Sequence, residues 1–222
     1  MVKTCEGIVI RQTKITGGRR MILVFTCEEG KISAGTHISE KGKGGAALAL
    51  RPFVHGRYTI SEKSAGIRSI TAAETISSNF ALGEDADRFS EASFVLEFTD
   101  KLLPEGVHEP GIFSLLKDYL NMIVVRKTDF RLLTISYIIK VLQELGVFPD
   151  EDSLSTSDLL SELNDDILKA VVYIAGQPLK RMESLILDSE EERVVFKAIR
   201  AYSQKYLDLG TIKSERMLVD NF

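Results

Sequence analysis

The sequence has few cysteines and no long apolar segment. Its two cysteines, Cys5 and Cys27, cannot form a disulfide framework or a four-thiolate zinc site, and we expect both to be small buried side chains in a reducing cytosol. The longest uninterrupted apolar run, residues 21–25, is far shorter than the roughly 20 residues that cross a bilayer. The first residues show no basic and then apolar leader, so we do not expect export.

Residue groups typical of catalysis are also missing. The three histidines, His37, His55 and His108, form neither an H-E-x-x-H motif nor a pair four residues apart, which favours surface or strand positions over metal ligation. The absence of a G-x-x-x-x-G-K-[ST] motif excludes a P-loop NTPase. We therefore expect no catalytic residue and no metal site.

Charge is distributed unevenly along the chain. Residues 1–77 contain 12 Lys and Arg against 6 Asp and Glu, a net charge of +6, whereas residues 78–222 contain 16 against 26, a net charge of −10. A basic portion ahead of an acidic one favours an anionic partner for the first part. The alternative is that solvated surface charge simply varies along the chain.

The apolar pattern changes at about the same place. Short β-rich runs separated by glycines are predicted at 8–10, 21–26, 32–38, 53–60 and 67–71, which is typical of a small barrel, closed or partly open. After Gly83 the period becomes helical, with a boundary near residues 77–84. Helices are predicted over 89–103, 110–123, 130–145, 165–176 and 190–206, with a tail after 210 that is only partly ordered.

Helix-start signals accompany these helices. Thr128 or Asp129 is predicted to cap the third helix, and Asn164 or Asp165 to start the fourth. Ser189 with Glu192 fits a capping box for the fifth. Phe89 is predicted to share the buried face of the first helix.

Basic residues gather in the predicted loops between strands. Such loops are where small barrels bind oligonucleotides, and cations beside glycines can follow a phosphate backbone. The candidate DNA-binding cations are Lys14, Arg19, Arg20, Lys41, Lys43 and Arg51.

Two aromatic residues in the fourth run are candidates for stacking against bases. Tyr58 shares a strand face with Val54 and Ile60, which favours a place in the core instead. Phe53 lies on the opposite face, where either role is open, and we count it among the candidate DNA-binding residues.

Residues 42–47 match the G-x-G-x-x-[GA] pattern of dinucleotide sites. That site also requires a helix that opens at the loop and then a second parallel strand. The next dozen residues contain Arg51-Pro52 and another alternating strand, which leaves little room for such a unit. A flexible basic loop is the better interpretation.

Several short segments, in order and at fixed spacing, resemble the RecO family of bacterial recombination mediators. The segments are EGIVIR at 6–11, MILVFTCEEGKI at 21–32, LRPF at 50–53, AE at 73–74, LLPEG at 102–106 and LQELGVFPD at 142–150. No single motif is specific, but their order and spacing together are. The resemblance covers most of residues 5–150 and, more weakly, the helical remainder.

The resemblance implies an α+β chain, with an N-terminal five-stranded OB-fold barrel over residues 1–79 and an all-α C-terminal domain over residues 80–222. RecO-like proteins bind single- and double-stranded DNA and anneal complementary strands without ATP. They act with RecR to load RecA onto DNA coated by single-stranded DNA-binding protein (SSB). The resemblance thus implies a cytoplasmic, nucleoid-associated protein that is not an enzyme, needs no cofactor and has no membrane partner.

The sequence departs from the family pattern at two places. Many members carry a four-cysteine zinc knuckle after the G-x-x-P-D segment, but residues 149–154 continue as PDEDSL without cysteine or histidine. We therefore predict no zinc. The loop at 39–47 has only Lys41 and Lys43 where relatives carry a denser basic cluster, which predicts weaker DNA affinity through this loop.

The family also docks the acidic, phenylalanine-ended tail of SSB on the helical domain. On chemistry alone, a cationic rim and apolar pocket for this tail are predicted at Arg126, Lys127, Phe130, Arg131 and Leu133. A solvated helix face is the alternative.

Two other functions stay open at this point. In one, the chain is a protein–protein adaptor that bridges a RecR-like ring and SSB with little direct DNA contact. In the other, it is an enzyme whose site lies at the 42–47 loop.

Overall fold

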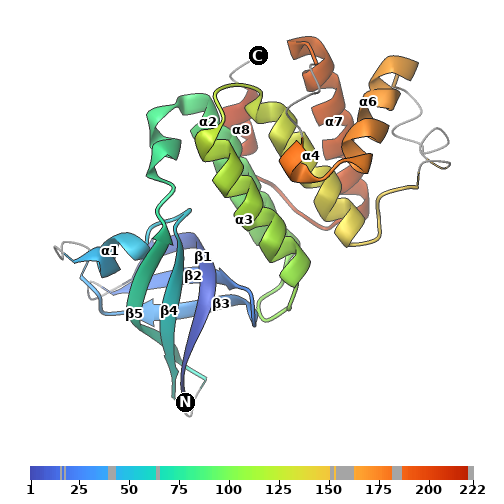
Figure 1. Ribbon diagram of the computed structural model, residues 1–222. Helices are drawn as coiled ribbons and strands as arrows, with labels where there is room; N and C mark the ends of the chain where they lie inside the picture. The colour runs from blue at the N-terminus through green and yellow to red at the C-terminus, as the bar shows by residue number, and fades with distance from the viewer. Residues whose placement is uncertain are drawn as a thin grey trace. The chain divides into compact units, whose positions relative to one another are not determined.

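The N-terminal part of the chain forms five strands that close into a barrel (Figure 1). The computed structural model describes residues 1–15, 17, 19–39, 44–63, 66–150, 153, 163–181 and 187–219. The strands are β1 (Val2–Lys14), β2 (Arg20–Thr26), β3 (Gly30–Thr36), β4 (His55–Glu62) and β5 (Arg68–Ser77). Helices follow, so the predicted α+β class with an OB-fold barrel is confirmed, and the barrel is closed in the order β1-β2-β3-β5-β4.

Strand β1 has 13 residues and pairs with different neighbours along its length. Its first part pairs antiparallel with β4, and its second part pairs antiparallel with β2. A register shift between Val9 and Arg11 marks the bend, as a β-bulge does in small barrels. The barrel closes where β3 and β5 pair in parallel at Gly35–Ser69 and Thr36–Ile70.

The barrel interior is apolar and is completed by a short helix. Tyr58 is fully buried in it, and its hydroxyl donates to Ala49 O (2.8 Å) and Val54 O (3.2 Å), so its predicted core position is confirmed. Ala49 ends helix α1 (Gly45–Ala49), and Leu50 also enters the core. The interpretation of residues 45–47 as a flexible loop is therefore wrong. Three alanines and a leucine favour a helix once the barrel buries one side of it.

One outer face of the barrel is covered by a later part of the chain. Phe25 in β2 is fully buried, and its ring meets the Phe113 ring edge-on at a centroid distance of 5.6 Å. Gly106 N donates to Lys31 O (3.0 Å), so the segment before Phe113 lies along β3. These contacts explain why Leu103–Lys117 forms one compact unit with Met1–Ala81.

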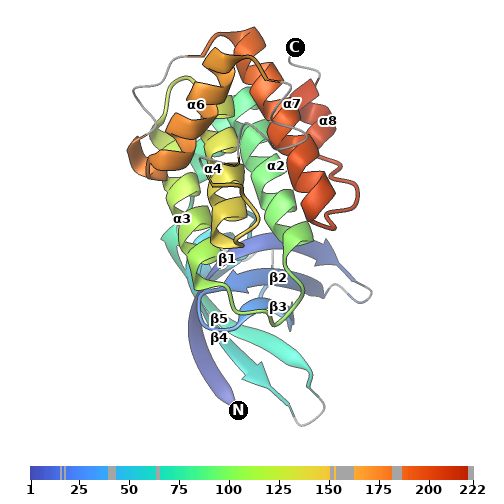
Figure 2. The same cartoon turned by 90° about the vertical axis from the view of Figure 1, so that its right-hand side faces the viewer.

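The second compact unit is helical and comprises Leu82–Leu102 and Asp118–Phe222. Among the described residues after the barrel, the helices are α2 (Ala86–Leu102), α3 (Pro110–Val125), α4 (Phe130–Glu144), α6 (Asp165–Gly176), α7 (Ser189–Tyr206) and α8 (Glu215–Val219), with 3-10 turns η2 (Phe80–Glu84) and η3 (Leu179–Arg181). Helix α4 packs against α2, α6 and α7 and is almost wholly buried at the centre of this unit (Figure 2). Within the described residues, no helix is long and apolar enough to cross a membrane.

The helix ends differ from the predictions in small, explicable ways. Asn164 caps α6 as predicted, and its side chain accepts from Ile167 N (2.9 Å). The capping box of α7 is formed by Asp188 and Glu191, one residue before the predicted pair, because D-x-x-E satisfies the same geometry as S-x-x-E. Phe89 is 40% exposed, so its predicted burial is wrong.

The C-terminal tail is more ordered than predicted. The Glu97 carboxylate accepts from Lys213 N (3.0 Å) and from Ser214 N (2.8 Å) and Oγ (2.7 Å). Ile212 and Leu218 are buried. The prediction of partial order therefore fails over residues 211–219, because one half-buried carboxylate satisfies the donors at the start of α8.

Candidate nucleic-acid interface

Two of the candidate cations that the structure describes are exposed on the hairpin formed by β1 and β2. Lys14 ends β1 and Arg19 precedes β2, and both side chains are exposed. Arg11, which sequence reasoning passed over, is also exposed on β1. Arg11 lies on the strand and not in the glycine-rich turn, so the pattern of loop cations did not predict it.

Arg20 is different because it is part of the fold. Only 3% of this residue is exposed, and its Nη2 donates to Ile38 O at 2.5 Å. Its guanidinium thus ties β2 to the chain after β3 and leaves little surface for a phosphate. Lys41 and Lys43 lie outside the described residues.

Arg51 and Phe53 follow helix α1 in a tight turn. Arg51 is exposed, and its guanidinium carbon lies 5.9 Å from the centroid of the Phe80 ring. Phe53 is half-buried with a φ of 71°, and its carbonyl accepts from Asn79 Nδ2 (2.8 Å). Sequence reasoning missed Phe80 and Asn79, because neither lies near Arg51 or Phe53 along the chain.

The hairpin and this turn are linked through Gln12. With its amide turned so that nitrogen faces the turn, Gln12 donates to Leu50 O (3.0 Å) and accepts from Arg20 Nη1 (3.1 Å). Leu50 is the neighbour of Arg51, and Arg20 is the neighbour of Arg19. The fold therefore ties strand β2 to the turn that carries Arg51, about 30 residues later in the sequence.

Three other basic residues of the barrel are paired with carboxylates. Lys3 pairs with Glu29, Arg57 with Glu74 (3.6 Å), and Arg68 with Glu62 (3.6 Å). These pairs neutralise charge locally, so the +6 excess of the first 77 residues does not spread evenly over the barrel. Replacing these three paired cations also gives a control variant that loses the same charge as a variant without three exposed cations.

The residues predicted to hold a partner's tail lie mostly inside the helical unit. Leu133 is fully buried, Phe130 and Arg131 are buried, and only Lys127 of the five is exposed. Arg126 is half-buried, and its Nη2 lies 4.0 Å from Asp129 Oδ2.

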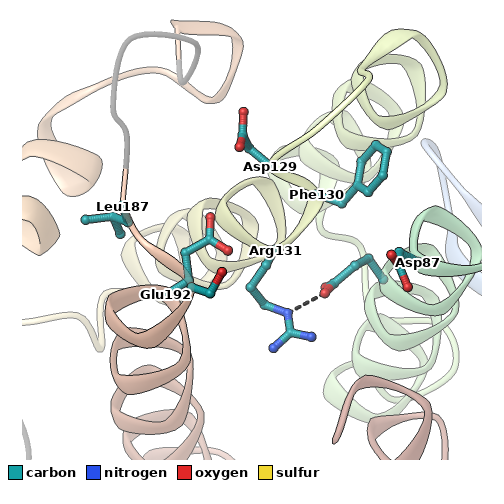
Figure 3. A pocket seen from close by; sticks show the side chains of 8 residues that line it. Asp87, Asp129, Phe130, Arg131, Leu187 and Glu192 are labelled. Carbon is teal, nitrogen blue, oxygen red and sulfur yellow. Dashed lines mark hydrogen bonds and ion pairs between the residues drawn. The ribbon is translucent and has the colours of Figure 1, made fainter. Parts of the chain in front are cut away.

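A pocket of about 320 Å³ in the helical unit includes two of these five residues (Figure 3). Arg131 Nε donates to the Glu91 carboxylate at its floor. Burial raises the pKa of Glu91, and burial together with the nearby Asp129 carboxylate raises that of Glu192 to about 7. The lining residues are Asp87, Glu91, Asp129, Phe130, Arg131, Leu187, Ser189 and Glu192. Four carboxylates face one guanidinium here, so the lining does not favour an acidic peptide.

The described residues offer little to the alternative of an enzyme at the 42–47 loop. Helix α1 leads into β4, which is antiparallel to both of its neighbours, β1 and β5, so the parallel strand of a dinucleotide site is not formed there. No three His, Cys, Asp or Glu side chains in the described ranges are grouped to hold a metal ion. Cys5 is buried as predicted, whereas Cys27 is only half-buried.

Comparisons with known proteins agree for both parts of the chain. Residues 1–79 match the family model described as "Recombination protein O N terminal", and residues 83–158 match "Recombination protein O C terminal". Proteins named "DNA repair protein RecO" from Bacillus cereus (strain B4264), Bacillus mycoides (strain KBAB4) and Bacillus anthracis (strain CDC 684 / NRRL 3495) are each 31% identical over 153 residues. The match covers 69% of this chain and 61% of each relative, so the chain spans about three-fifths of the length of these curated relatives. Two family models in the expected order, on a five-stranded barrel followed by helices, show that the chain belongs to the RecO family of recombination proteins.

Proposed function

We propose that this chain is a DNA-binding mediator of recombinational repair that holds DNA on its barrel. The observation that carries the proposal is the set of exposed cations on the barrel, Lys14 and Arg19 in the β1–β2 hairpin and Arg51 in the turn after α1. Cations of this kind neutralise phosphates and release condensed counterions, which supplies affinity for DNA of any sequence. Single and double strands both present this backbone, so both are bound.

Annealing follows from the same contacts. Two complementary strands repel each other through their phosphates, and a surface that neutralises part of this charge lowers the barrier to pairing. No nucleotide is consumed in such a step, so the chain acts without catalytic residues or a cofactor. Membership of the RecO family supports partnership with RecR and SSB, and through them an indirect role in loading RecA.

The first test is a salt titration of the full chain with a fluorescent single-stranded oligonucleotide, read by anisotropy. The triple variant Lys14→Ala/Arg19→Ala/Arg51→Ala removes three exposed cations. If each contacts one phosphate, the slope of log K against log salt becomes shallower by about 2. Affinity for all sequences falls alike.

The matched control removes the same charge from carboxylate-paired sites of the barrel. The variant Lys3→Ala/Arg57→Ala/Arg68→Ala also loses three positive charges, but from residues paired with Glu29, Glu74 and Glu62. We expect its salt slope to match that of the unsubstituted chain. A second variant, Lys41→Ala/Lys43→Ala, tests the predicted contribution of that loop.

Two outcomes contradict the proposal. If the unsubstituted chain binds no oligonucleotide at low salt, it does not act through direct DNA contact. Capture of RecR or of an SSB tail peptide in the same experiment then favours the adaptor alternative. If the control variant loses as much affinity as the test variant, DNA lies elsewhere on the barrel.

A further inference from the structure

Two non-glycine residues with left-handed backbone meet at one point of the barrel unit. Phe53 has a φ of 71° and Asn79 a φ of 53°, and in the described ranges they share positive φ with only one other non-glycine residue, Asp129. A bulky aromatic residue rarely adopts this conformation. Strain of this kind persists only where neighbouring contacts enforce it, and it is common at ligand-binding sites.

The enforcing contacts are hydrogen bonds made by Asn79, which is itself buried. Its Nδ2 donates to Phe53 O (2.8 Å), and its Oδ1 accepts from Ser77 Oγ (2.9 Å). On the other side of the turn, Phe53 N donates to Val9 O (3.0 Å), at the point where β1 changes partner. The turn after α1 is thereby fixed to both β1 and the end of β5.

The turn after α1 and the segment after β5, which these hydrogen bonds join, carry an aromatic ring and a cation that lie close together at the surface. Phe80 directly follows Asn79 and is 47% exposed, so its ring is accessible to a ligand. The exposed Arg51 lies with its guanidinium carbon 5.9 Å from the centroid of that ring. Planar rings stack on nucleobases, and an adjacent guanidinium adds attraction for bases and phosphate.

Resting on the proposed function, we infer that Arg51 and Phe80 form a base-stacking site for single-stranded DNA, beside the turn that Asn79 ties to Phe53. An exposed ring beside an exposed guanidinium identifies the occupant by its chemistry as a strand with unstacked bases and anionic phosphates. Gln12 ties the turn of Arg51 to strand β2, because it bonds both Leu50 O and Arg20 Nη1. Bases within a duplex are already stacked on their neighbours, so they cannot use this site. The site therefore makes the barrel prefer single strands over duplexes.

The test compares full-length variants on three DNA probes: a single-stranded oligonucleotide that contains 2-aminopurine, the same strand with an abasic site at every position, and a duplex. The chain contains no tryptophan, so 2-aminopurine fluorescence reports base stacking without interference. Phe80→Leu keeps the apolar volume and removes the ring. It lowers single-strand affinity by about 5- to 50-fold, removes the 2-aminopurine signal on binding and leaves abasic and duplex affinity within about twofold.

Two further variants make the result specific. Phe80→Tyr restores the ring and therefore restores single-strand binding. Tyr206→Leu is the matched control, because Tyr206 is 49% exposed and has the Lys205 ammonium 5.5 Å from its ring centroid, but belongs to the helical unit. We expect this control to bind all three probes like the unsubstituted chain.

The outcomes separate this inference from the proposed function. If the unsubstituted chain binds no probe, the proposed function fails. If it binds, but Phe80→Leu leaves single-strand affinity unchanged or weakens the abasic strand and the duplex equally, the stacking site alone is wrong. Loss of a protein partner by Phe80→Leu, with DNA affinity unchanged, also overturns the inference and assigns this surface to protein.

Discussion

Gly30→Ala tests whether the segment after α2 is an integral part of the barrel. Gly30 has a φ of +68°, and a Cβ at this position would lie 1.9 Å from Val107 O and 2.6 Å from Val107 C. A left-handed conformation costs an alanine about 1 kcal/mol. Backbone atoms cannot rotate away as a flexible side chain can, so overpacking adds about 1–3 kcal/mol. We expect a loss of about 2–4 kcal/mol in the free energy of unfolding.

The control for this prediction is Gly146→Ala. Gly146 has the same φ of +68°, but no heavy atom lies within 4 Å of its added Cβ, so only the conformational cost of about 1 kcal/mol applies. Urea unfolding followed by far-ultraviolet circular dichroism measures both variants. Amide exchange at Gly106, which donates to Lys31 O, shows whether the segment separates from β3. Equal losses in the two variants, with Gly106 still protected, would refute the close approach of Val107 to β3.

Two other predictions concern the helical unit. Burial raises the pKa of the Glu97 carboxyl, but the hydrogen bonds from residues 213–214 lower it more, to below its usual 4.5. These hydrogen bonds therefore stabilise the folded protein fully above about pH 4.5. Their contribution is lost as the pH falls through the pKa that Glu97 has in the folded protein. Protection of the 213–214 amides should fall over that range, and Glu97→Gln should remove this pH dependence. Thr99 Oγ1 donates to Val95 O (2.8 Å), so the Tyr137 hydroxyl donates to Thr99 (2.7 Å). In urea unfolding, Tyr137→Phe should cost about 1 kcal/mol and Thr99→Val about 1–3 kcal/mol, because only the second leaves a buried donor unpaired; equal costs would contradict this assignment.

Local patterns predicted the strands and most helices because burial on one face leaves a period in the sequence. The run 21–26 is apolar at nearly every position, and β2 is accordingly buried on both faces. Helix α1 was missed because the glycines around residue 44 outweighed the alanines after them. The barrel supplies the burial that makes five residues helical, and such tertiary support cannot be seen in a short window.

The candidate interface was predictable only in part, for a similar reason. A list of loop cations identified Lys14, Arg19 and Arg51, which the structure leaves exposed. The same reasoning included Arg20, whose burial depends on a carbonyl 18 residues away. Phe80 carries no local signal, because it becomes notable only through a cation 29 residues earlier in the chain.

The return of residues 103–117 to the barrel affects how the protein can be divided experimentally. The chain leaves the barrel unit after Ala81 and re-enters it at Leu103, so no single cut separates the two units. A fragment that stops at residue 79 would uncover Phe25 and leave Lys31 O without the amide of Gly106. An apolar face beside an unpaired strand edge invites self-association. Studies of the isolated barrel should therefore retain the residues up to 117 and replace helix α2, which is about 25 Å long, with a linker of matching reach.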